Sequence, residues 1–159
     1  MKSIIGDVCH VKILNMKEEK IDIYTDGSCI GNPGPGGWAA IIQYDGKEIK
    51  ISGKSKDTTN NRMEMTAIIK ALEYLHDKTE FTQEELQKYQ ITVFSDSNLL
   101  IQTLTQGWKR KANLDLWSKI DKLRAWLSIT WTWVKAHDTN HYNNLVDKLA
   151  FQEAKKVKR

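Results

Sequence analysis

Four acidic residues occupy positions that are unusual for surface carboxylates. Asp26 and Asp96 each lie at or near the end of a segment that alternates like a β-strand, and parallel neighbouring strands would bring both to one edge of a sheet. Glu64 faces the apolar side of a predicted helix, and Asp147 lies at the border of the apolar face of another. Two carboxylates about 4 Å apart repel by roughly 4 kcal/mol at an effective dielectric of about 20. If the four side chains meet, the cluster must therefore bind protons or cations.

Each of these carboxylates also has a purely structural explanation. Asp26 precedes a stretch rich in glycine and proline, where it could cap a turn. Asn61 and Glu64 fit a capping box, although that role does not require the glutamate to face the core. An acid in the first turns of a helix is favoured by the helix dipole, which is the better explanation of Asp147 taken alone. Only the four residues together indicate a site.

An all-oxygen ligand set predicts the kind of ion that such a cluster would hold. Carboxylates without a histidine or thiolate cage select hard cations, Mg²⁺ or Mn²⁺. Two such ions about 4 Å apart are a common means of cleaving phosphodiester bonds. A zinc site built from His137, His141 and a cysteine is disfavoured, because the loop is polar and the sequence has no paired cysteines. The chemistry indicated is therefore hydrolysis assisted by magnesium or manganese.

The elements that position these residues follow from the hydrophobic periodicity of the chain. Three strands come first, joined by the glycine-rich stretch and by an Asp45-Gly46 hairpin turn, and this order predicts an antiparallel meander. Strands and helices then alternate, which predicts an α/β fold with a mixed sheet covered by helices. The expected strands are 21–28, 38–44, 47–53, 91–95 and 129–134. The expected helices are 62–76, 82–89, 98–105, 114–126 and 143–156. Asn61 is the expected cap of the first helix, and a capping box of Thr82 and Glu85 opens the second.

The composition is that of a single globular domain. The chain has 159 residues, of which 40% are hydrophobic and 28% charged, and its net charge of +4 permits a polyanionic partner without requiring one. No apolar run approaches the roughly 20 residues of a membrane span, and with only two cysteines we expect reduced thiols. We expect a cytoplasmic monomer with its domain over residues 20–157, preceded by an extension, residues 1–19, of unknown role.

Four segments give the chain a resemblance to ribonuclease H, type 1. They are Tyr24–Trp38 with Thr-Asp-Gly-Ser and Gly-Asn-Pro-Gly-Pro-Gly-Gly, Thr58–Leu72 with Thr-Thr-Asn-Asn-Arg-Met-Glu-Met-Thr-Ala, Ser95-Asp96-Ser97, and Trp133–Ala150. They occur in the family's order with near-family spacing over roughly residues 20–155, and the first two are long enough to be highly specific. Residues 20–157 are accordingly expected to form a ribonuclease H catalytic domain.

The resemblance implies a ribonuclease H-like fold, a five-stranded mixed sheet with three antiparallel strands followed by two parallel to the first. It implies an endonuclease that hydrolyses the RNA strand of RNA–DNA hybrids to 5′-phosphate and 3′-hydroxyl ends. Asp26, Glu64, Asp96 and Asp147 would bind two Mg²⁺ ions, or Mn²⁺ in their place, one generating the attacking hydroxide and the other stabilising the leaving 3′-oxygen. His137 falls on the catalytic-loop histidine, ten residues before Asp147, and would assist water positioning or product release. A hybrid-binding module that is catalytically weak or inactive and a retroelement-type ribonuclease H domain are the alternatives.

The resemblance also assigns substrate contacts. Amide side chains both donate to and accept from a 2′-hydroxyl group, which distinguishes RNA from DNA. Thr59 matches a residue that helps hold a phosphate of the DNA strand, and Asn143 matches one near the catalytic loop. Any single asparagine could instead form a turn. The positions that fall on or beside minor-groove contacts are Cys29, Asn32, Asn60, Asn61 and Asn98.

One departure from the family concerns the long basic protrusion that many bacterial members carry after the fourth strand. Here it shrinks to residues 106–112, so part of the usual substrate-gripping surface is reduced. Within this segment Trp108 is expected to contact the substrate by stacking or by lying on a DNA sugar, while Lys109, Arg110 and Lys111 contact phosphates.

Three further tryptophans and the connection between the first predicted helix and the fourth predicted strand are the remaining notable features of the sequence. Trp126, Trp131 and Trp133 are expected to pack in the core. The connection His76–Gln90 is an addition relative to the family, and the sequence assigns it no role.

Overall fold

The computed structural model describes residues 19–157, so the expected extension lies, apart from Glu19, outside the described residues. At its centre is a five-stranded sheet in the order β3-β2-β1-β4-β5. The first three strands pair antiparallel, whereas β4 runs parallel to β1 and β5 parallel to β4, which confirms the predicted meander and mixed sheet. The strands are β1 (Lys20–Cys29), β2 (Gly34–Tyr44), β3 (Lys47–Thr58), β4 (Gln90–Ser95) and β5 (Ile129–Trp133).

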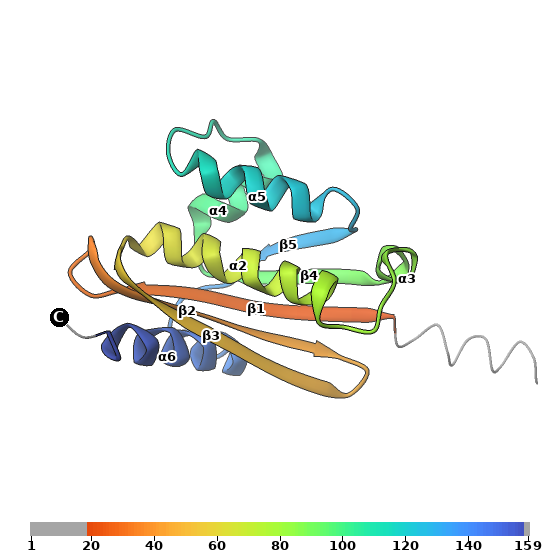
Figure 1. Cartoon of the computed structure of the whole chain (residues 1–159), viewed down its shortest axis with the longest axis horizontal. Helices are drawn as coiled ribbons and strands as arrows, with labels where there is room; N and C mark the ends of the chain where they lie inside the picture. Colours follow the sequence, from red (N-terminus) through yellow and green to blue (C-terminus); the bar gives the residue numbers. More distant parts are fainter. Residues whose placement is uncertain (1–18, 158–159) are drawn as a thin grey trace, which may run out of the picture.

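Helices cover both faces of the sheet (Figure 1). On one face α6 packs against β1 and β2, where its Val146 and Ala150 join Ala39 and Ile41 in a small apolar cluster. The other face carries α2, which contacts β1 and β2 and packs against α5. No helix in the part of the chain described here has the length and apolar character needed to cross a membrane. The helices are α2 (Asn60–Asp77), α3 (Gln83–Lys88), α4 (Asn98–Gln106), α5 (Leu114–Arg124) and α6 (His141–Lys155).

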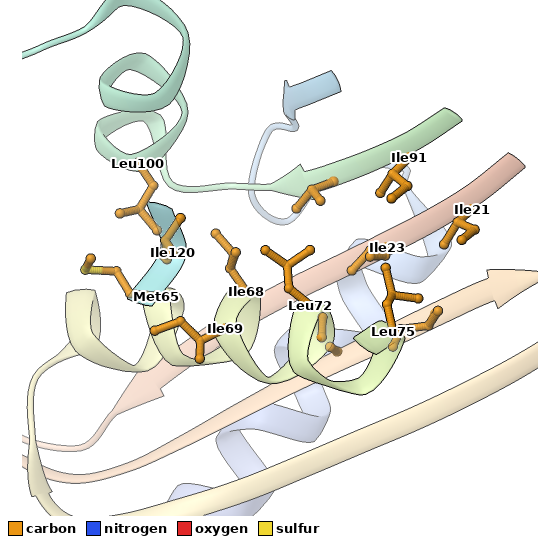
Figure 2. Packing of buried hydrophobic residues seen from close by; sticks show 14 of the residues in the cluster. Ile21, Ile23, Met65, Ile68, Ile69, Leu72, Leu75, Ile91, Leu100 and Ile120 are labelled. Carbon is orange, nitrogen blue, oxygen red and sulfur yellow. The ribbon is translucent and has the colours of Figure 1, made fainter. Parts of the chain in front are cut away.

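The main core lies between the sheet and α2. The helix presents a stripe of fully buried side chains, among them Ile68, Leu72 and Leu75, to Ile21 and Ile23 of β1 (Figure 2). Burying each such side chain stabilises the fold by about 1.5–3 kcal/mol relative to leaving it exposed. This packing fixes the axis of α2 over β1, and with it the first turn of the helix.

The start of α2 differs from the prediction. Thr59, and not Asn61, is the N-cap, and its hydroxyl accepts a hydrogen bond from the backbone N–H of Arg62 at 3.3 Å. A hydroxyl on the residue before the first turn satisfies an N–H group that has no partner within the helix. The prediction of Asn61 as the cap is therefore wrong, and the capping box with Glu64 does not form.

The connection between α2 and β4 closes one end of the sheet. Thr82 caps α3 as predicted, because its hydroxyl accepts from the backbone N–H of Glu85 at 3.2 Å. The ring of Phe81 lies 5.3 Å from the ring of Tyr44 at the end of β2 and 4.7 Å from that of Tyr89. The added connection thus packs on the β2–β3 hairpin, at the end of the sheet where α2 ends (Figure 1).

Of the three tryptophans expected in the core, only Trp131 packs against it. Trp126 is 55% exposed and Trp133 is 47% exposed. α5 ends at Arg124, so Trp126 lies beyond the amphipathic part of the helix. Trp133 is the last residue of β5, which is an edge strand. The prediction of core packing is wrong for both.

Gly27 allows β1 and the first turn of α2 to approach each other. A Cβ atom at this position would overlap the backbone of Met63 and Glu64. Because backbone cannot move aside as a flexible side chain can, Gly27→Ala should push α2 away from β1 and destabilise the protein by about 1–3 kcal/mol. Urea unfolding measures this loss. An unchanged unfolding midpoint would contradict the close approach.

Gly46→Ala is the matched control for that measurement. Its Cβ would meet nothing within 4 Å, and only the positive φ of 73° disfavours it. It should cost about 1 kcal/mol through backbone strain, without moving α2.

Candidate active site

Three of the predicted metal ligands meet at the end of β1. Asp26 and Glu64 are buried and Asp96 is partly buried, and each offers a carboxylate oxygen within 4.8 Å of the other two. Asp26 comes from β1, Asp96 directly follows the parallel neighbour β4, and Glu64 comes from the first turns of α2. The prediction that Glu64 faces the sheet is confirmed. Three carboxylates at this spacing fit a hard divalent cation, which prefers oxygen ligands.

Burial and mutual repulsion keep protons on this cluster. Loss of solvent and the charge of Asp96 raise the pKa of Asp26 strongly, and the same two causes raise the pKa of Glu64 to about 7. Burial, followed by the charge of Asp147, also raises the pKa of Asp96. Hydrogen bonds oppose these shifts, among them those from the backbone N–H of Gly27 to Asp26 at 2.9 Å and from Asn60 Nδ2 to Glu64 Oε1 at 3.0 Å. A bound cation would take over the role of the protons.

Asp147 and His137 lie at the open side of this cluster. Asp147, on α6, raises the pKa values of both Asp26 and Asp96, so it adjoins them without belonging to the group of three. Its side chain is 39% exposed, whereas that of His137 is 79% exposed. His137 Nδ1 lies 3.6 Å from Asp147 Oδ2, in the loop between β5 and α6. His137 is therefore reached by solvent far more readily than the buried carboxylates are.

The backbone around Asp96 is braced by groups that the sequence interpretation did not assign to the site. The indole Nε1 of Trp133 donates to the carbonyl oxygen of Asp96 at 3.1 Å, and the N–H of Val134 donates to that of Ser95 at 2.9 Å. Ser97 then caps α4 by accepting from the N–H of Leu100 at 3.3 Å. The chain therefore leaves β4 in a fixed direction. The alternation of β5 placed Trp133 on a face but could not show that this face borders Asp96.

Several predicted substrate contacts gather beside the cluster. Asn32 Oδ1, in the loop between β1 and β2, accepts from the backbone N–H of Asn60 at 3.0 Å. The thiol of Cys29 donates to the carbonyl oxygens of Gly34 and Thr58 at 3.4 and 3.3 Å. These contacts link the glycine-rich loop to the start of α2. Cys29, Asn32 and Asn60 thus lie on one continuous surface beside Glu64, with Thr59 as the helix cap between β3 and α2.

The other predicted contacts are more dispersed. Asn98 is exposed at the start of α4, and Asn61 lines a cavity farther along the same side. Asn143 is only 2% exposed and sits in the first turn of α6, which begins at His141 because Asn140 Oδ1 accepts from the N–H of Asn143 at 2.9 Å. Its Nδ2 group has no hydrogen-bond partner among the described residues. Asn143 therefore holds a buried amide donor close in sequence to the loop that carries His137.

The shortened protrusion folds over a cavity of about 530 Å³ between α2, α4 and α5. Trp108 is 48% exposed at its mouth. The guanidinium of Arg110 makes two hydrogen bonds with Asp121 and lies 4.4 Å from the ring centre of Trp117. Arg110 is thus already paired and stacked, so its expected role as a free phosphate contact is corrected to a structural one. Lys109 and Lys111 make no ion pair with any described residue.

The sheet order and the acidic cluster at its centre define a hydrolase of the ribonuclease H-like fold. The RNase H family model matches residues 18–155, and the chain belongs to this family as a type 1 ribonuclease H. It is 41% identical to the ribonuclease H of Ehrlichia canis, with 89% of this chain and 100% of that protein covered. It is also 41% identical to the ribonuclease H of Acetivibrio thermocellus, with 87% and 97% covered.

Solved structures agree with this assignment. LC11-RNase H1, whose structure is in complex with an RNA/DNA hybrid, is 27% identical and superposes with a TM-score of 0.69 over 86% of this chain and 97% of that one. LC9-RNase H1, a type 1 RNase H with the type 2 active-site motif, is 25% identical with a TM-score of 0.70 over 87% and 74%.

Replacing one acid of the cluster with a neutral group of the same shape should stabilise the protein when divalent cations are absent. The raised pKa values mean that the folded state binds more protons than the unfolded state, so their contribution to stability is complete below about pH 4 and is lost as the pH rises through the folded values, about 7 for Glu64. Asp26→Asn removes the most strongly shifted group. In EDTA at pH 7 its free energy of unfolding should rise by about 1–3 kcal/mol, and hybrid cleavage should fall by orders of magnitude.

Urea unfolding at pH 5, 6, 7 and 8 checks the stability part of this prediction. The wild-type free energy of unfolding should decline across the series in EDTA, more steeply than that of Asp26→Asn, and Mg²⁺ should reduce the decline. A lower unfolding midpoint for Asp26→Asn in EDTA would contradict the repulsion, and near wild-type cleavage would remove Asp26 from the reaction.

Proposed function

We propose that this enzyme is an endonuclease that hydrolyses the RNA strand of RNA–DNA hybrids, leaving 5′-phosphate and 3′-hydroxyl ends, with two divalent cations, Mg²⁺ or Mn²⁺. The observation that carries the proposal is the cluster of Asp26, Glu64 and Asp96, each of which offers a carboxylate oxygen within 4.8 Å of the other two. The hybrid-bound relative supports the choice of substrate. The cations supply Lewis acidity for phosphodiester hydrolysis when they are bound.

The residues of this chain have separable roles in the proposal. Asp26, Glu64 and Asp96 would hold the cations, and Asp147 would complete the ligand set from α6. Asn60 Nδ2 keeps the Glu64 carboxylate oriented by its hydrogen bond at 3.0 Å. His137, exposed and 3.6 Å from Asp147, would hold a proton or a water at the open side of the cluster and assist release of the product.

Selection of RNA would come from the surface beside the cluster. Its amides can pair with 2′-hydroxyl groups in the minor groove, as donors or as acceptors. Thr59 and Asn143 would help to position the nucleic-acid backbone. On the other side of α2, Trp108, Lys109 and Lys111 would contact the DNA strand.

A single gel tests the proposal against an inactive hybrid-binding module. End-labelled hybrid, RNA duplex and single-stranded RNA are incubated with the enzyme in Mg²⁺, in Mn²⁺ and in EDTA, and the products are assayed for 5′-phosphate ends. The proposal expects cleavage of the hybrid alone and only with metal. Retention of the hybrid without cleavage would favour the binding module.

A second prediction separates His137 from the metal ligands. If its imidazole acts in turnover, His137→Ala should lower kcat by about 10- to 100-fold, with little change in KM or in the Mg²⁺ concentration required, as expected when a proton-transfer group is lost. Steady-state kinetics across a Mg²⁺ series measure all three quantities. A large rise in the required Mg²⁺, or an effect confined to KM, would instead give His137 a binding role.

A third prediction concerns the grip on the DNA strand. Since Arg110 is paired with Asp121, only Lys109 and Lys111 are expected to neutralise phosphates. Replacing both with Gln should reduce the slope of log K against log salt by about two, roughly one per phosphate contact, and should raise KM while kcat is kept. Trp108→Ala should weaken binding by about 1–3 kcal/mol with no change in slope, because stacking releases no counterions.

KM for a short hybrid across a salt series, measured for the wild type and these variants, provides the check. Arg110→Gln is the matched comparison, and it should lower the unfolding midpoint while the salt slope changes little. If the double lysine variant keeps the wild-type slope, the grip lies elsewhere on the protein.

A further inference from the structure

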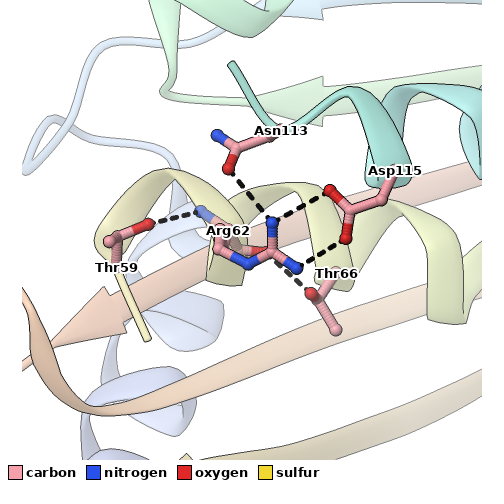
Figure 3. Close-up of polar contacts among 5 residues, drawn as sticks. All are labelled: Thr59, Arg62, Thr66, Asn113 and Asp115. Carbon is pink, nitrogen blue, oxygen red and sulfur yellow. Dashed lines mark hydrogen bonds and ion pairs between the residues drawn. The ribbon is translucent and has the colours of Figure 1, made fainter. Parts of the chain in front are cut away.

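Arg62 joins the first turn of α2 to the end of the shortened protrusion. Its Nη1 donates to Asn113 Oδ1 and to Asp115 Oδ1, both at 3.1 Å, and its Nη2 donates to Asp115 Oδ2 at 2.8 Å (Figure 3). This is a two-pronged pairing of a guanidinium with a carboxylate, extended to a third acceptor. Such pairings fix relative orientation as well as distance. The hydrogen bonds from Arg62 lower the pKa of Asp115 to about 2.

Asn113 shows that this contact shapes the backbone of the protrusion. It precedes α5 with a positive φ of 57°, a conformation that few non-glycine residues adopt. Its side chain makes no capping hydrogen bond to α5, because its amide oxygen is taken by Arg62. Its carbonyl oxygen accepts from the N–H groups of Leu116 and Trp117. Arg62 thus holds the residue at which the segment turns into α5.

Arg110 anchors the same segment at a second point, through Asp121 and the face of Trp117 on α5. Lys109 and Lys111 flank Arg110, and neither makes an ion pair with a described residue. The segment is therefore fixed to α5 by one arginine and to α2 by the other.

The α2 end of the contact belongs to the turn that carries Glu64. The backbone N–H of Arg62 donates to Thr59, and its carbonyl oxygen accepts from the hydroxyl of Thr66 at 2.7 Å (Figure 3). Asn60, in the same turn, donates to Glu64. Side chains separated by two positions on an α-helix point to nearly opposite sides of it. From this one turn, Arg62 therefore faces the protrusion and Glu64 faces the carboxylate cluster.

We propose that Arg62 is a positioning residue, which fixes the spacing between the protrusion that holds the DNA strand and the carboxylate that holds the metal. This inference rests on the proposed substrate role of Trp108, Lys109 and Lys111. A fixed spacing determines which phosphodiester of a gripped hybrid reaches the cluster. Without the contact between Arg62 and Asp115, the protrusion would still bind the hybrid. The hybrid would then lie in several registers relative to the carboxylates, because the protrusion would be less ordered before binding.

The test uses Arg62→Lys and Asp115→Asn, because both keep a polar group at the surface while they remove the two-pronged pairing. Each should raise KM by about three- to ten-fold, with kcat changed less than about two-fold, since the carboxylates are untouched. Each should also spread the cuts in a short end-labelled hybrid over neighbouring positions. The double variant should be no worse than either single one, because the two residues act as one unit.

Glu73→Gln is the matched control. It removes an exposed acid from α2 whose partner, Lys70, lies 3.8 Å away on the same helix, far along the chain from the protrusion. It should leave KM and the cut positions unchanged. A purely structural role of Arg62 would lower the unfolding midpoint without moving the cut positions, and that result would overturn the proposal.

Asp115→Asn distinguishes positioning from direct contact. If Arg62 itself bound a phosphate, loss of Asp115 would free it and lower KM, so a lower or unchanged KM overturns the proposal. The double lysine variant separates this failure from that of the grip itself. If that variant keeps the wild-type KM and salt slope, the protrusion does not bind the DNA strand, and the positioning role of Arg62 is overturned as well. If it raises KM while the Arg62 and Asp115 variants do not, only the positioning role is overturned.

Discussion

Repulsion among the carboxylates at the end of β1 is the constraint on which the rest of the structure depends. Two like charges about 4 Å apart cost roughly 4 kcal/mol at an effective dielectric of about 20. Each fully buried side chain of α2, such as Ile68, Leu72 and Leu75, offsets this with about 1.5–3 kcal/mol. The apolar stripe therefore outweighs the repulsion, and the protein can keep Asp26 and Glu64 together before any cation binds. The price is the raised pKa of both groups.

The sequence predicted the cluster better than it predicted the surroundings. Strand alternation and helical periodicity place Asp26, Asp96 and Glu64 correctly, because each depends only on its own element and on the parallel pairing of β1 with β4. Caps and edges depend on single contacts across the fold, which periodicity does not contain. Thr59, and not Asn61, caps α2. Trp133, on the edge strand, donates a hydrogen bond to the carbonyl oxygen of Asp96.

The arginine and the lysines of the short protrusion have different roles. The guanidinium of Arg110 lies over the ring of Trp117 and pairs with Asp121, which makes it a fixed structural contact. Lys109 and Lys111 carry compact, well hydrated charges on flexible stems, which can follow a phosphate backbone. Counting three basic residues as equal phosphate contacts overlooked this difference. In the proposed function, their order, with one arginine between two lysines, would allow a short segment both to fold and to contact phosphates.

The amides beside the cluster set a limit on how RNA can be selected. In the free protein one end of each amide is already used, because Asn60 Nδ2 donates to Glu64 and Asn32 Oδ1 accepts from the backbone N–H of Asn60. Pairing of the other end with a 2′-hydroxyl would replace a hydrogen bond to water, for a net gain of about 0.5–1.5 kcal/mol at each amide. DNA, which lacks the group, would lose only that gain at each amide. Strong preference for RNA must therefore be summed over several amides that engage one minor groove together, and this requires the rigid loop that Cys29 and Asn32 tie to the start of α2.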